Sequence, residues 1–490
     1  MLLVTPSQME KIDADTIERH GLPSLVLMES AARSVLPHIP PGPVAVLVGP
    51  GNNGGDGLVI ARALHELGRE VQAYLFAAKL SDDAETQLRL ARAWGVEVHQ
   101  LEENATPKFV PGSVVVDSLF GTGLKRALQG KYTRALEKAN QAACYRLAVD
   151  IPSGVDGATG QILGTAFRAH ATVTFGVAKW GHVLHPGKGC CGELVVTQPG
   201  FHPEALRQFP QIRQVNFGSL EGLLPHQWET MHKGDNGRIL LVTGSETYPG
   251  AGLLSTLGAL RGGGGLVTLS CPPSLRDPII TRAPEALLED REELDSLDAF
   301  NALVLGSGLG SETDSLAPDL LNRFTGPTVV DADALRCVAR FSREKRANWI
   351  LTPHPGELSK LLEIPVSQLE SDRIGSALRA AESLGAIVCF KGAPTVCAAP
   401  DGRAFVSASG NAILAQGGSG DVLAGLIGAY LGFGLPPLEA AAGAVFIHGL
   451  ASDLLKEEAG PKGSGAAALA ERIPQALAYA IGKQRTSGVH

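Results

Sequence analysis

The 490-residue chain has few of the features that mark secreted, membrane or nucleic-acid-binding proteins. It contains no run of about 18 apolar residues, and its first residues, MLLVTPSQMEKIDADTIERHG, lack a basic segment followed by a long apolar one. We therefore expect neither a membrane span nor a secretion signal. The net charge is −8 and no long Lys or Arg block occurs, so the chain has no electrostatic attraction to nucleic acid or anionic lipid.

Cysteine is also scarce. The seven cysteines are an odd number, with one adjacent pair at Cys190 and Cys191 and no C-x-x-C spacing. This pattern is typical of reduced thiols rather than of a disulfide framework or a zinc site. We expect a cytoplasmic protein.

Glycine is abundant, whereas aromatic residues make up only 5% of the chain. The 59 glycines, 31 prolines and 44% hydrophobic residues are typical of soluble, turn-rich α/β enzymes whose backbone approaches ligands closely. At about 100–200 residues per domain, the length predicts two or three domains.

Short apolar runs alternate with helical patterns in two series, which is typical of mostly parallel sheets covered by helices. The expected strands of the first series are 44–48, 71–76, 113–117, 145–150, 171–176 and 193–197. Those of the second are 238–244, 266–270, 302–306, 328–331, 349–352, 386–392 and 395–399, followed by a long helix from Gly420.

The residues between the two series, 201–237, form a polar and broken stretch. We therefore place a boundary near residue 220, with domains at 1–218 and 219–490. No repeat of about 20–50 residues relates the halves, so two different α/β domains are expected.

Three loops with ligand-binding character leave the carboxyl ends of first-series strands. They are GPGNNGGDG (49–57), DSLFGTGL (117–124) and DIPSGVD (150–156). In open α/β sheets the ligand binds at that edge.

The first loop has the Gly49-x-Gly51-x-x-Gly54 spacing of a dinucleotide fingerprint, so its backbone amides are expected to contact phosphate. A nicotinamide cofactor would also need an acidic residue at the end of the second strand. That strand ends instead in AAK at 77–79. A tightly held redox cofactor is therefore disfavoured.

Asn53, Asp117 and Ser153 would each supply a hard oxygen from a neighbouring loop. Such a ligand set suits a weakly held alkali or alkaline-earth cation rather than zinc. Asp117 and Asp150 could instead be helix or turn caps, as most acidic residues directly after strands are. The agreement of three loops favours the cation site.

The three loops, in this order and spacing, together with IERHGLPSLVLMES (17–30), resemble the NAD(P)H-hydrate epimerase domain over residues 1–215. The resemblance implies a Rossmann-like three-layer fold that binds hydrated NADH or NADPH. It also implies potassium at Asn53, Asp117 and Ser153, and an acid/base role for Asp150. The implied substrate-binding residues are Asn52, Asn53, Gly54, Gly55, Asp56, Gly121, Thr122, Gly123, Leu124, Lys125, Arg126, Ala127 and Asp150. The sequence SAA at 30–32 departs from the family's Asn-Ala-Gly.

In the second half, GGSGDVLAG (417–425) starts the long helix. Its glycines expose backbone N–H groups at the helix start, which favours phosphate binding. Asp421 could accept a proton from a substrate hydroxyl beside that phosphate. The alternative is an ordinary acidic residue at a helix N-terminus. The glycines favour the catalytic interpretation.

Three further segments accompany this helix start, namely GSGLG (306–310), TPHPGE (352–357) and KGAPT (391–395). His354 lies between two prolines on a stiff loop, where it could contact a ligand or cap a helix. Lys391 could contact a phosphate. No Walker-type motif surrounds it, so a P-loop fold is not expected.

These segments resemble the NAD(P)H-hydrate dehydratase domain, a ribokinase-like α/β fold, over residues 225–488. The resemblance implies that Ala251, Gly308, His354 and Asp421 contact the hydrate, with Asp421 catalytic. The residues implied to hold the adenine nucleotide are Lys391, Gly392, Ala393, Pro394, Thr395 and Gly420. Ser307 and Ser419 stand where the family more often has Pro and Thr.

Together the resemblances predict a bifunctional repair enzyme that epimerises the R and S forms of hydrated NAD(P)H and dehydrates the S form using ADP. They imply potassium in the first domain and magnesium in the second, although no residue decides between ADP and ATP. The expected partners are hydrated NADH, hydrated NADPH and ADP, and a homo-oligomer is the expected assembly. The alternative is a ribokinase-like kinase for a vitamin precursor or sugar, with a non-catalytic nucleotide-binding first domain.

Overall fold

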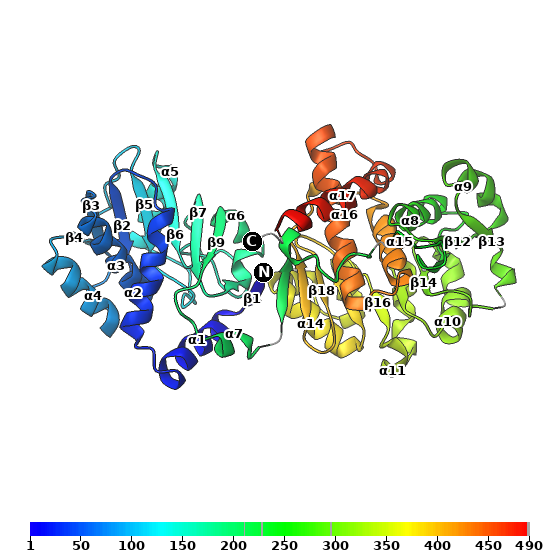
Figure 1. The fold of residues 1–490 in the computed structure, drawn as a ribbon, viewed down its shortest axis with the longest axis horizontal. Coiled ribbons are helices and arrows are strands. Elements are labelled where there is room, and N and C mark those ends of the chain that lie inside the picture. Colours follow the sequence, from blue (N-terminus) through cyan, green and yellow to red (C-terminus); the bar gives the residue numbers. More distant parts are fainter. Residues whose placement is uncertain (210, 227–228, 295, 488–490) are drawn as a thin grey trace. The chain divides into compact units, whose positions relative to one another are not determined.

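The computed structural model describes residues 1–209, 211–226, 229–294 and 296–487, and the chain divides into two compact units (Figure 1). The first unit comprises residues 2–210, and the second comprises residue 1 and residues 211–490. This division precedes the expected boundary at 218/219 because β10 (Ile212–Val215) pairs with β19 (Ala404–Ser407) of the second unit.

The first unit contains a seven-stranded parallel sheet in the order β4-β3-β2-β5-β6-β7-β9. Its strands are β2 (Val44–Val48), β3 (Val71–Leu75), β4 (Glu97–Gln100), β5 (Val114–Ser118), β6 (Tyr145–Val149), β7 (Ala171–Phe175) and β9 (Glu193–Thr197). The chain runs outward from β2 to one edge and then returns to build the other side, so the carboxyl ends of β2 and β5 meet at the switch point. All six expected strands are confirmed. The polar edge strand β4 was missed because it has no apolar run.

Helices cover both faces of this sheet. They are α1 (Pro6–Ala14), a π-helical turn (Asp15–Arg19), α2 (Ser24–Val35), α3 (Asn52–Glu66), α4 (Asp82–Ala93), α5 (Lys131–Gln141), α6 (Lys188–Cys191) and α7 (Pro203–Arg207). The short strands β1 (Leu2–Val4) and β8 (Ala178–Lys179) pair in parallel. Side chains alternate along a strand, so Val46 packs with residues of α2 and α3 whereas Leu47 packs with residues of α5. The expected three-layer Rossmann-like domain is therefore confirmed.

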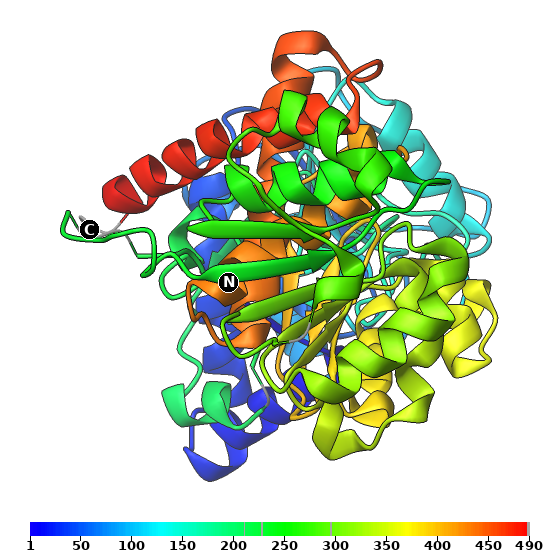
Figure 2. The same ribbon diagram turned by 90° about the vertical axis from the view of Figure 1, so that its right-hand side faces the viewer.

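The sheet of the second unit has the order β13-β12-β11-β14-β15-β16-β17-β18-β19-β10, and Figure 2 shows it between helices. Its further strands are β11 (Arg238–Val242), β12 (Leu266–Ser270), β13 (Leu287–Glu289), β14 (Ala302–Leu305), β15 (Thr328–Val330), β16 (Trp349–Leu351), β17 (Ile387–Phe390) and β18 (Val396–Ala398). All pairings are parallel except those of β18. The seven expected strands are confirmed, whereas β10, β13 and β19 were missed.

The helices of the second unit are α8 (Pro249–Arg261), α9 (Arg276–Arg282), α10 (Thr313–Arg323), α11 (Arg343–Arg346), α12 (Pro355–Leu362), α13 (Val366–Ser371), α14 (Arg373–Leu384), α15 (Ser419–Gly432), α16 (Pro437–Ala459) and α17 (Ala466–Ser487). Two of them, α8 and α15, touch backbone to backbone. A Cβ on Gly425 would lie 1.9 Å from the carbonyl oxygen of Ser255, so only glycine fits there. This contact holds the middle of α15 directly against α8.

Helix α16 is long and apolar enough to cross a membrane by length and composition. However, 83% of its apolar window is buried inside the structure. Packing in the core of the second unit accounts for its composition.

Candidate active sites

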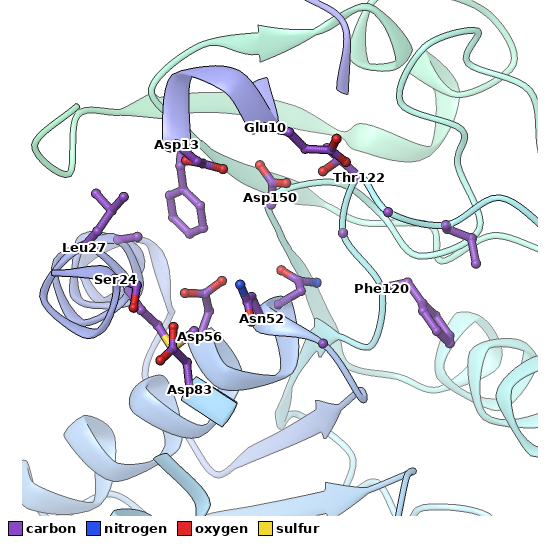
Figure 3. Close-up of a pocket in the computed structure, with 18 of the residues that line it drawn as sticks. Glu10, Asp13, Ser24, Leu27, Asn52, Asp56, Asp83, Phe120, Thr122 and Asp150 are labelled. Carbon is purple, nitrogen blue, oxygen red and sulfur yellow. The ribbon is translucent and has the colours of Figure 1, made fainter. Parts of the chain in front are cut away.

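The carboxyl ends of β2, β5 and β6 open into a cavity of about 680 Å³ in the first unit (Figure 3). Of the residues expected to bind substrate, those that line it are Asn52, Asn53, Asp56, Gly121, Thr122, Gly123, Leu124, Lys125, Arg126 and Asp150. Gly54 and Gly55 lie buried in the first turn of α3, and Ala127 is exposed outside the lining. The structure thus brings the three loops together at one site.

The glycines of the first loop let it lie against the loop after β5. A Cβ on Gly49 would be 1.6 Å from the carbonyl oxygen of Leu119, and one on Gly54 would be 2.1 Å from that of Gly49. Gly51 precedes α3, and a Cβ there would meet nothing within 4 Å. The first N–H groups of a helix have no acceptor within it, so the start of α3 offers donors to a ligand in the cavity.

Asp150 follows β6 directly and has a left-handed backbone with φ 66°. Its Oδ1 accepts hydrogen bonds from Lys179 Nζ at 2.6 Å and from Thr174 Oγ1 at 2.9 Å. Burial raises the pKa of Asp150, but the charge of Lys179 and the hydrogen bonds from Lys179 and Thr174 together outweigh burial, and the net pKa lies below the usual value. Asp150 is therefore a carboxylate at neutral pH.

His182 supports this residue from the backbone side. Its Nδ1 accepts from the Lys179 N–H at 3.0 Å, which leaves Nε2–H to donate to the Asp150 carbonyl oxygen at 2.8 Å. Burial, together with the charge of Lys179, lowers the pKa of His182 to about 4. The imidazole is neutral and holds Asp150 in place.

Two other carboxyl groups at the cavity have a pKa that is raised instead of lowered. Burial raises the pKa of Asp13 to about 7, and the negative charge of Asp150 adds to this although Lys179 opposes it. Burial, then Asp150 and Asp13, raise the pKa of Asp56 well above its usual value. One ionised carboxylate thus faces two carboxyls that retain their protons more readily (Figure 3).

Two of the three expected cation ligands are direct neighbours. Asp117 accepts from Ser153 twice, through the backbone N–H at 2.8 Å and through Oγ at 2.7 Å. Burial raises the pKa of Asp117 to about 6, although the hydrogen bonds from Ser153 and Leu119 lower it. A nearby cation would offset the burial of this carboxylate.

Asn53, the third expected ligand, has a buried amide group. Among the described residues, neither its oxygen nor its nitrogen has a hydrogen-bond partner. A Cβ on Gly121 would lie 3.5 Å from both the Asn53 side chain and Asp150 Oδ2, so Asn53 lies close to Asp150. A buried oxygen without a donor fits a hard cation.

In the second unit, Asp331 follows β15 and is nearly fully buried. Its Oδ1 accepts from Lys391 Nζ at 2.9 Å and from Thr352 Oγ1 at 2.5 Å, and its Oδ2 accepts from Ser307 Oγ at 2.8 Å. Burial opposes ionisation, but Lys391 and the hydroxyl groups lower the net pKa of Asp331. Asp331, which is buried, and Lys391, which is partly exposed, thus form an ion pair, and Ser307 is small and polar enough to donate to it.

The start of α15 lies beside this ion pair. Burial and then the charge of Asp331 raise the pKa of Asp421 to about 6, while Lys391 lowers it. A Cβ on Gly420 would be 3.4 Å from Lys391 Nζ. The structure therefore brings Lys391, Gly420 and Asp421 together at a helix N-terminus, where an anion is favoured.

Ala251 and Gly308 also meet. Gly308 has φ 66°, and a Cβ there would lie 2.6 Å from the Cβ of Ala251 at the start of α8. This contact requires glycine at 308.

His354 is the N-cap of α12. Its Nδ1 accepts from the N–H groups of Gly356 at 3.0 Å and Glu357 at 3.4 Å. His354 thus caps the helix through Nδ1, and 56% of its side chain is exposed, so its contact with the hydrate stays a prediction.

The KGAPT loop is held by a buried arginine of α14, Arg373. Its guanidinium donates to the carbonyl oxygens of Phe390, Lys391 and Pro394 at 3.1, 2.9 and 3.0 Å. A Cβ on Gly392 would lie 2.4 Å from this guanidinium. Arg373 therefore fixes the loop that carries Lys391.

Sequence reasoning missed Asp13, Lys179, Asp331 and Arg373. A signal existed for Asp331, because it ends an apolar strand as Asp117 and Asp150 do. Lys179 and Arg373 gave none, since their partners are distant in sequence.

Each unit places an ionised aspartate at the end of a parallel strand and pairs it with a lysine. Two such sites define a two-domain α/β enzyme. The family model described as NAD(P)H-hydrate dehydratase matches residues 239–475, and that of the YjeF-related protein N-terminus matches residues 24–181. The bifunctional NAD(P)H-hydrate repair enzyme of Thermofilum pendens is 39% identical, over 97% of this chain and 96% of its own. That of Escherichia coli is 37% identical, over 85% of this chain and 82% of its own.

Among solved structures, the ADP/ATP-dependent NAD(P)H-hydrate dehydratase of Bacillus subtilis, co-crystallised with ATP and Mg²⁺, matches with a TM-score of 0.50 and 29% identity. The match covers 56% of this chain and 99% of that one. The chain belongs to the family of bifunctional NAD(P)H-hydrate repair enzymes. The family, the fold class and the expected kind of enzyme are thereby confirmed.

Proposed function

We propose that the first unit interconverts the R and S hydrates of NADH and NADPH, and that the second removes water from the S hydrate with ADP as co-substrate. One observation supports both halves best. In each unit a lysine within hydrogen-bonding distance keeps an aspartate ionised, beside a second carboxyl group whose pKa is raised. Such pairs of carboxyls with opposite shifts suit proton transfer near neutral pH.

In the first unit, Asp150 accepts the proton of the hydrate's hydroxyl group. The cavity volume of about 680 Å³ lies in the ordinary range for ligand sites. Leu27, Phe175 and Phe201 give it an apolar wall for the nicotinamide ring. The N–H groups at the start of α3 are donors for the nucleotide's phosphates.

We assign a potassium ion to Asn53, Asp117 and Ser153. The unpartnered amide oxygen of Asn53 and the buried carboxyl of Asp117 support this assignment. When bound, the ion would supply positive charge that stabilises the Asp117 carboxylate and fixes the loops around it.

In the second unit, Asp421 accepts the proton of the hydrate's hydroxyl while that oxygen attacks the terminal phosphate of the nucleotide. The bond from that phosphorus to its bridging oxygen breaks, so ADP leaves as AMP. The oxygen then leaves the ring as inorganic phosphate, and the neighbouring ring carbon loses a proton to solvent, which restores the dihydronicotinamide. The KGAPT loop, Lys391 and the start of α15 hold the phosphates. Magnesium, when bound with the nucleotide, would neutralise their charge.

The test is repair of separately purified R and S hydrates, followed by the near-ultraviolet absorbance of reduced nicotinamide, with ADP or ATP. We expect the wild-type chain to repair both forms and Asp150→Asn to repair only the S form above the spontaneous rate of epimerisation. R-hydrate repair by Asp150→Asn at the wild-type rate would contradict the epimerase assignment. Phosphorylation of a sugar or a hydroxymethylpyrimidine, with the hydrates unrepaired, would establish the kinase alternative.

The seven cysteines are all buried free thiols, which supports the proposed cytoplasmic location.

A further inference from the structure

Asp150 can accept a proton, but epimerisation also requires a group that donates one. Hydration of an enamine places the hydroxyl group on the ring carbon next to the nitrogen. Inverting that carbon requires breaking and remaking one of its bonds to nitrogen or oxygen. A proton must leave one atom and reach another, so an acid has to act beside the base.

Helix α1 brings such a group to the cavity. Thr5 and Gln8 form a capping box at its start, and Met9 and Ile12 are buried on the face that packs into the core. Glu10 and Asp13, three residues apart on one side of the helix, line the cavity instead. Figure 3 shows both side chains at the cavity that Asp150 also lines.

The Asp13 carboxyl has no fixed partner. Among the described residues, neither a hydrogen bond nor an ion pair of this carboxyl is found. The buried ammonium of Lys179 donates to Asp150 at 2.6 Å and not to Asp13. The Asp13 carboxyl is therefore available to a ligand.

The charged groups that shift the pKa of Asp13 come from three elements. They are Glu10 on α1, Asp150 after β6, and Lys179 on β8, and two of these three are acidic. Asp13 in turn raises the pKa of Asp56 on α3. Burial and the negative charges hold the proton on Asp13 until the pH reaches about 7, against the opposing effect of Lys179.

We propose that Asp13 is the proton donor that acts together with Asp150 in epimerisation. This inference rests on the proposed epimerase function of the first unit. It adds a second catalytic residue, from a segment that no loop motif of the sequence includes.

The two residues complete a closed reaction cycle. Asp150 takes the hydroxyl proton as the bond between the ring carbon and nitrogen breaks, and the electron pair of that bond goes to nitrogen, which takes the proton of Asp13. The carbon is now an aldehyde and can rotate. Nitrogen then adds to its other face and returns its proton to Asp13, while Asp150 returns its proton to oxygen. Both residues recover their starting states, and no co-reactant is consumed.

Asp13→Asn in the full chain tests this inference, with R-hydrate repair as the assay. Additional dehydratase is supplied as a separate protein, so that epimerisation limits the rate. We expect kcat for epimerisation to fall by about 10²–10⁴-fold with little change in KM, because Asn keeps the shape of the side chain but donates no acidic proton. Wild-type kcat/KM should fall above about pH 7 as Asp13 ionises. Asp13→Glu should restore part of the activity together with this alkaline limb.

The matched control is Asp82→Asn, which neutralises an exposed aspartate at the start of α4 and should leave both activities unchanged. Repair of the S hydrate by each variant reports that the chain is folded. If Asp13→Asn does not fold, the Asp13→Glu pH profile decides, and an unchanged rate without an alkaline limb overturns the proposal.

Wild-type epimerisation in Asp13→Asn would also overturn it. If Asp150→Asn is inactive at the same time, the proposed function stands and only the role of Asp13 is wrong. If Asp150→Asn is fully active, the proposed function itself is wrong.

Discussion

In both units a lysine keeps an aspartate ionised although burial opposes ionisation, but the residues around the two ion pairs differ. In the first, Lys179 donates to Asp150 at 2.6 Å, and in the second Lys391 donates to Asp331 at 2.9 Å. In both, the aspartate directly follows a parallel strand and has a lowered pKa, although burial opposes ionisation. A nearby carboxyl, Asp13 or Asp421, has a raised pKa.

The difference lies in which aspartate meets the substrate. Asp150 lines the cavity with a partly exposed side chain, whereas Asp331 is 2% exposed and is surrounded by Lys391, Ser307 and Thr352. We infer that the ionised aspartate of the first unit is itself a reactant. That of the second positions Lys391 and raises the pKa of Asp421. An aspartate–lysine ion pair thus occurs in both units, but its aspartate reacts with substrate in the first unit and positions other residues in the second.

The largest expected effect separates the two activities. Asp421→Asn should lower kcat for dehydration of the S hydrate by about 10²–10⁴-fold, because the hydroxyl loses its proton acceptor. Interconversion of R and S hydrates, measured by chromatographic separation, should stay at the wild-type rate. A parallel loss of epimerisation would show that the two sites are not independent.

Removing either lysine should destabilise its own unit. Lys179→Met or Lys391→Met leaves a buried aspartate without its cation, and we expect the free energy of unfolding of that unit to fall by about 3–5 kcal/mol. Urea unfolding of each variant beside the wild type, followed by far-ultraviolet circular dichroism, measures this loss. Lys11→Met, at an exposed position of α1, is the control and should change little. Adding Asp150→Asn to Lys179→Met should recover part of the loss, and a purely additive double variant would contradict this explanation.

The pH dependence should run in opposite directions in the two units. Asp421 has a pKa raised to about 6 and acts as a base, so kcat/KM for dehydration should rise about tenfold per pH unit below pH 6 and level off above it. Epimerisation needs the proton of Asp13 and should decline above about pH 7. The kcat/KM of each activity, measured from pH 5 to 9, checks both changes. If both activities fell on the same side of neutral pH, the proposed difference between the two units would be wrong.

Smaller effects should come from the hydroxyl groups that support each aspartate. Thr174→Val removes the donor to Asp150, and Ser307→Ala removes one donor to Asp331. Each should lower the free energy of unfolding by about 1.5–3 kcal/mol, as expected for hydrogen bonds to a charged group. Thermal melting of the two variants side by side measures this. Asp150 loses one of two side-chain donors and Asp331 one of three, so a larger loss is expected for Thr174→Val.

The sequence predicted the elements whose signal is local. Apolar runs located thirteen strands, and the loops after three of them contained half of the residues that line the first cavity. The strands β4 and β10 were missed because each is short and mixes polar with apolar residues. Their pairing partners, not their composition, make them strands.

The missed site residues share a different cause. Glu10 and Asp13 alternate with Met9 and Ile12 in the pattern of an ordinary surface helix, and sequence alone does not show that the polar face meets a cavity. Lys179 is a buried charge 29 positions from Asp150, and nothing near it in sequence marks that pairing. Asp331 did carry a local signal, since it ends an apolar run in the sequence as Asp117 and Asp150 do.

The pairing of Asp150 with Lys179 also constrains how the family can diverge. A change at position 150 alone leaves Lys179, which is 1% exposed, without a counter-ion, and a change at position 179 alone leaves the Asp150 carboxylate without its cation. The left-handed backbone at 150 further restricts its replacements to residues such as Asn or Gly. A single substitution at either position is therefore unfavourable. Among related sequences, we expect positions 150 and 179 to be kept together or changed together.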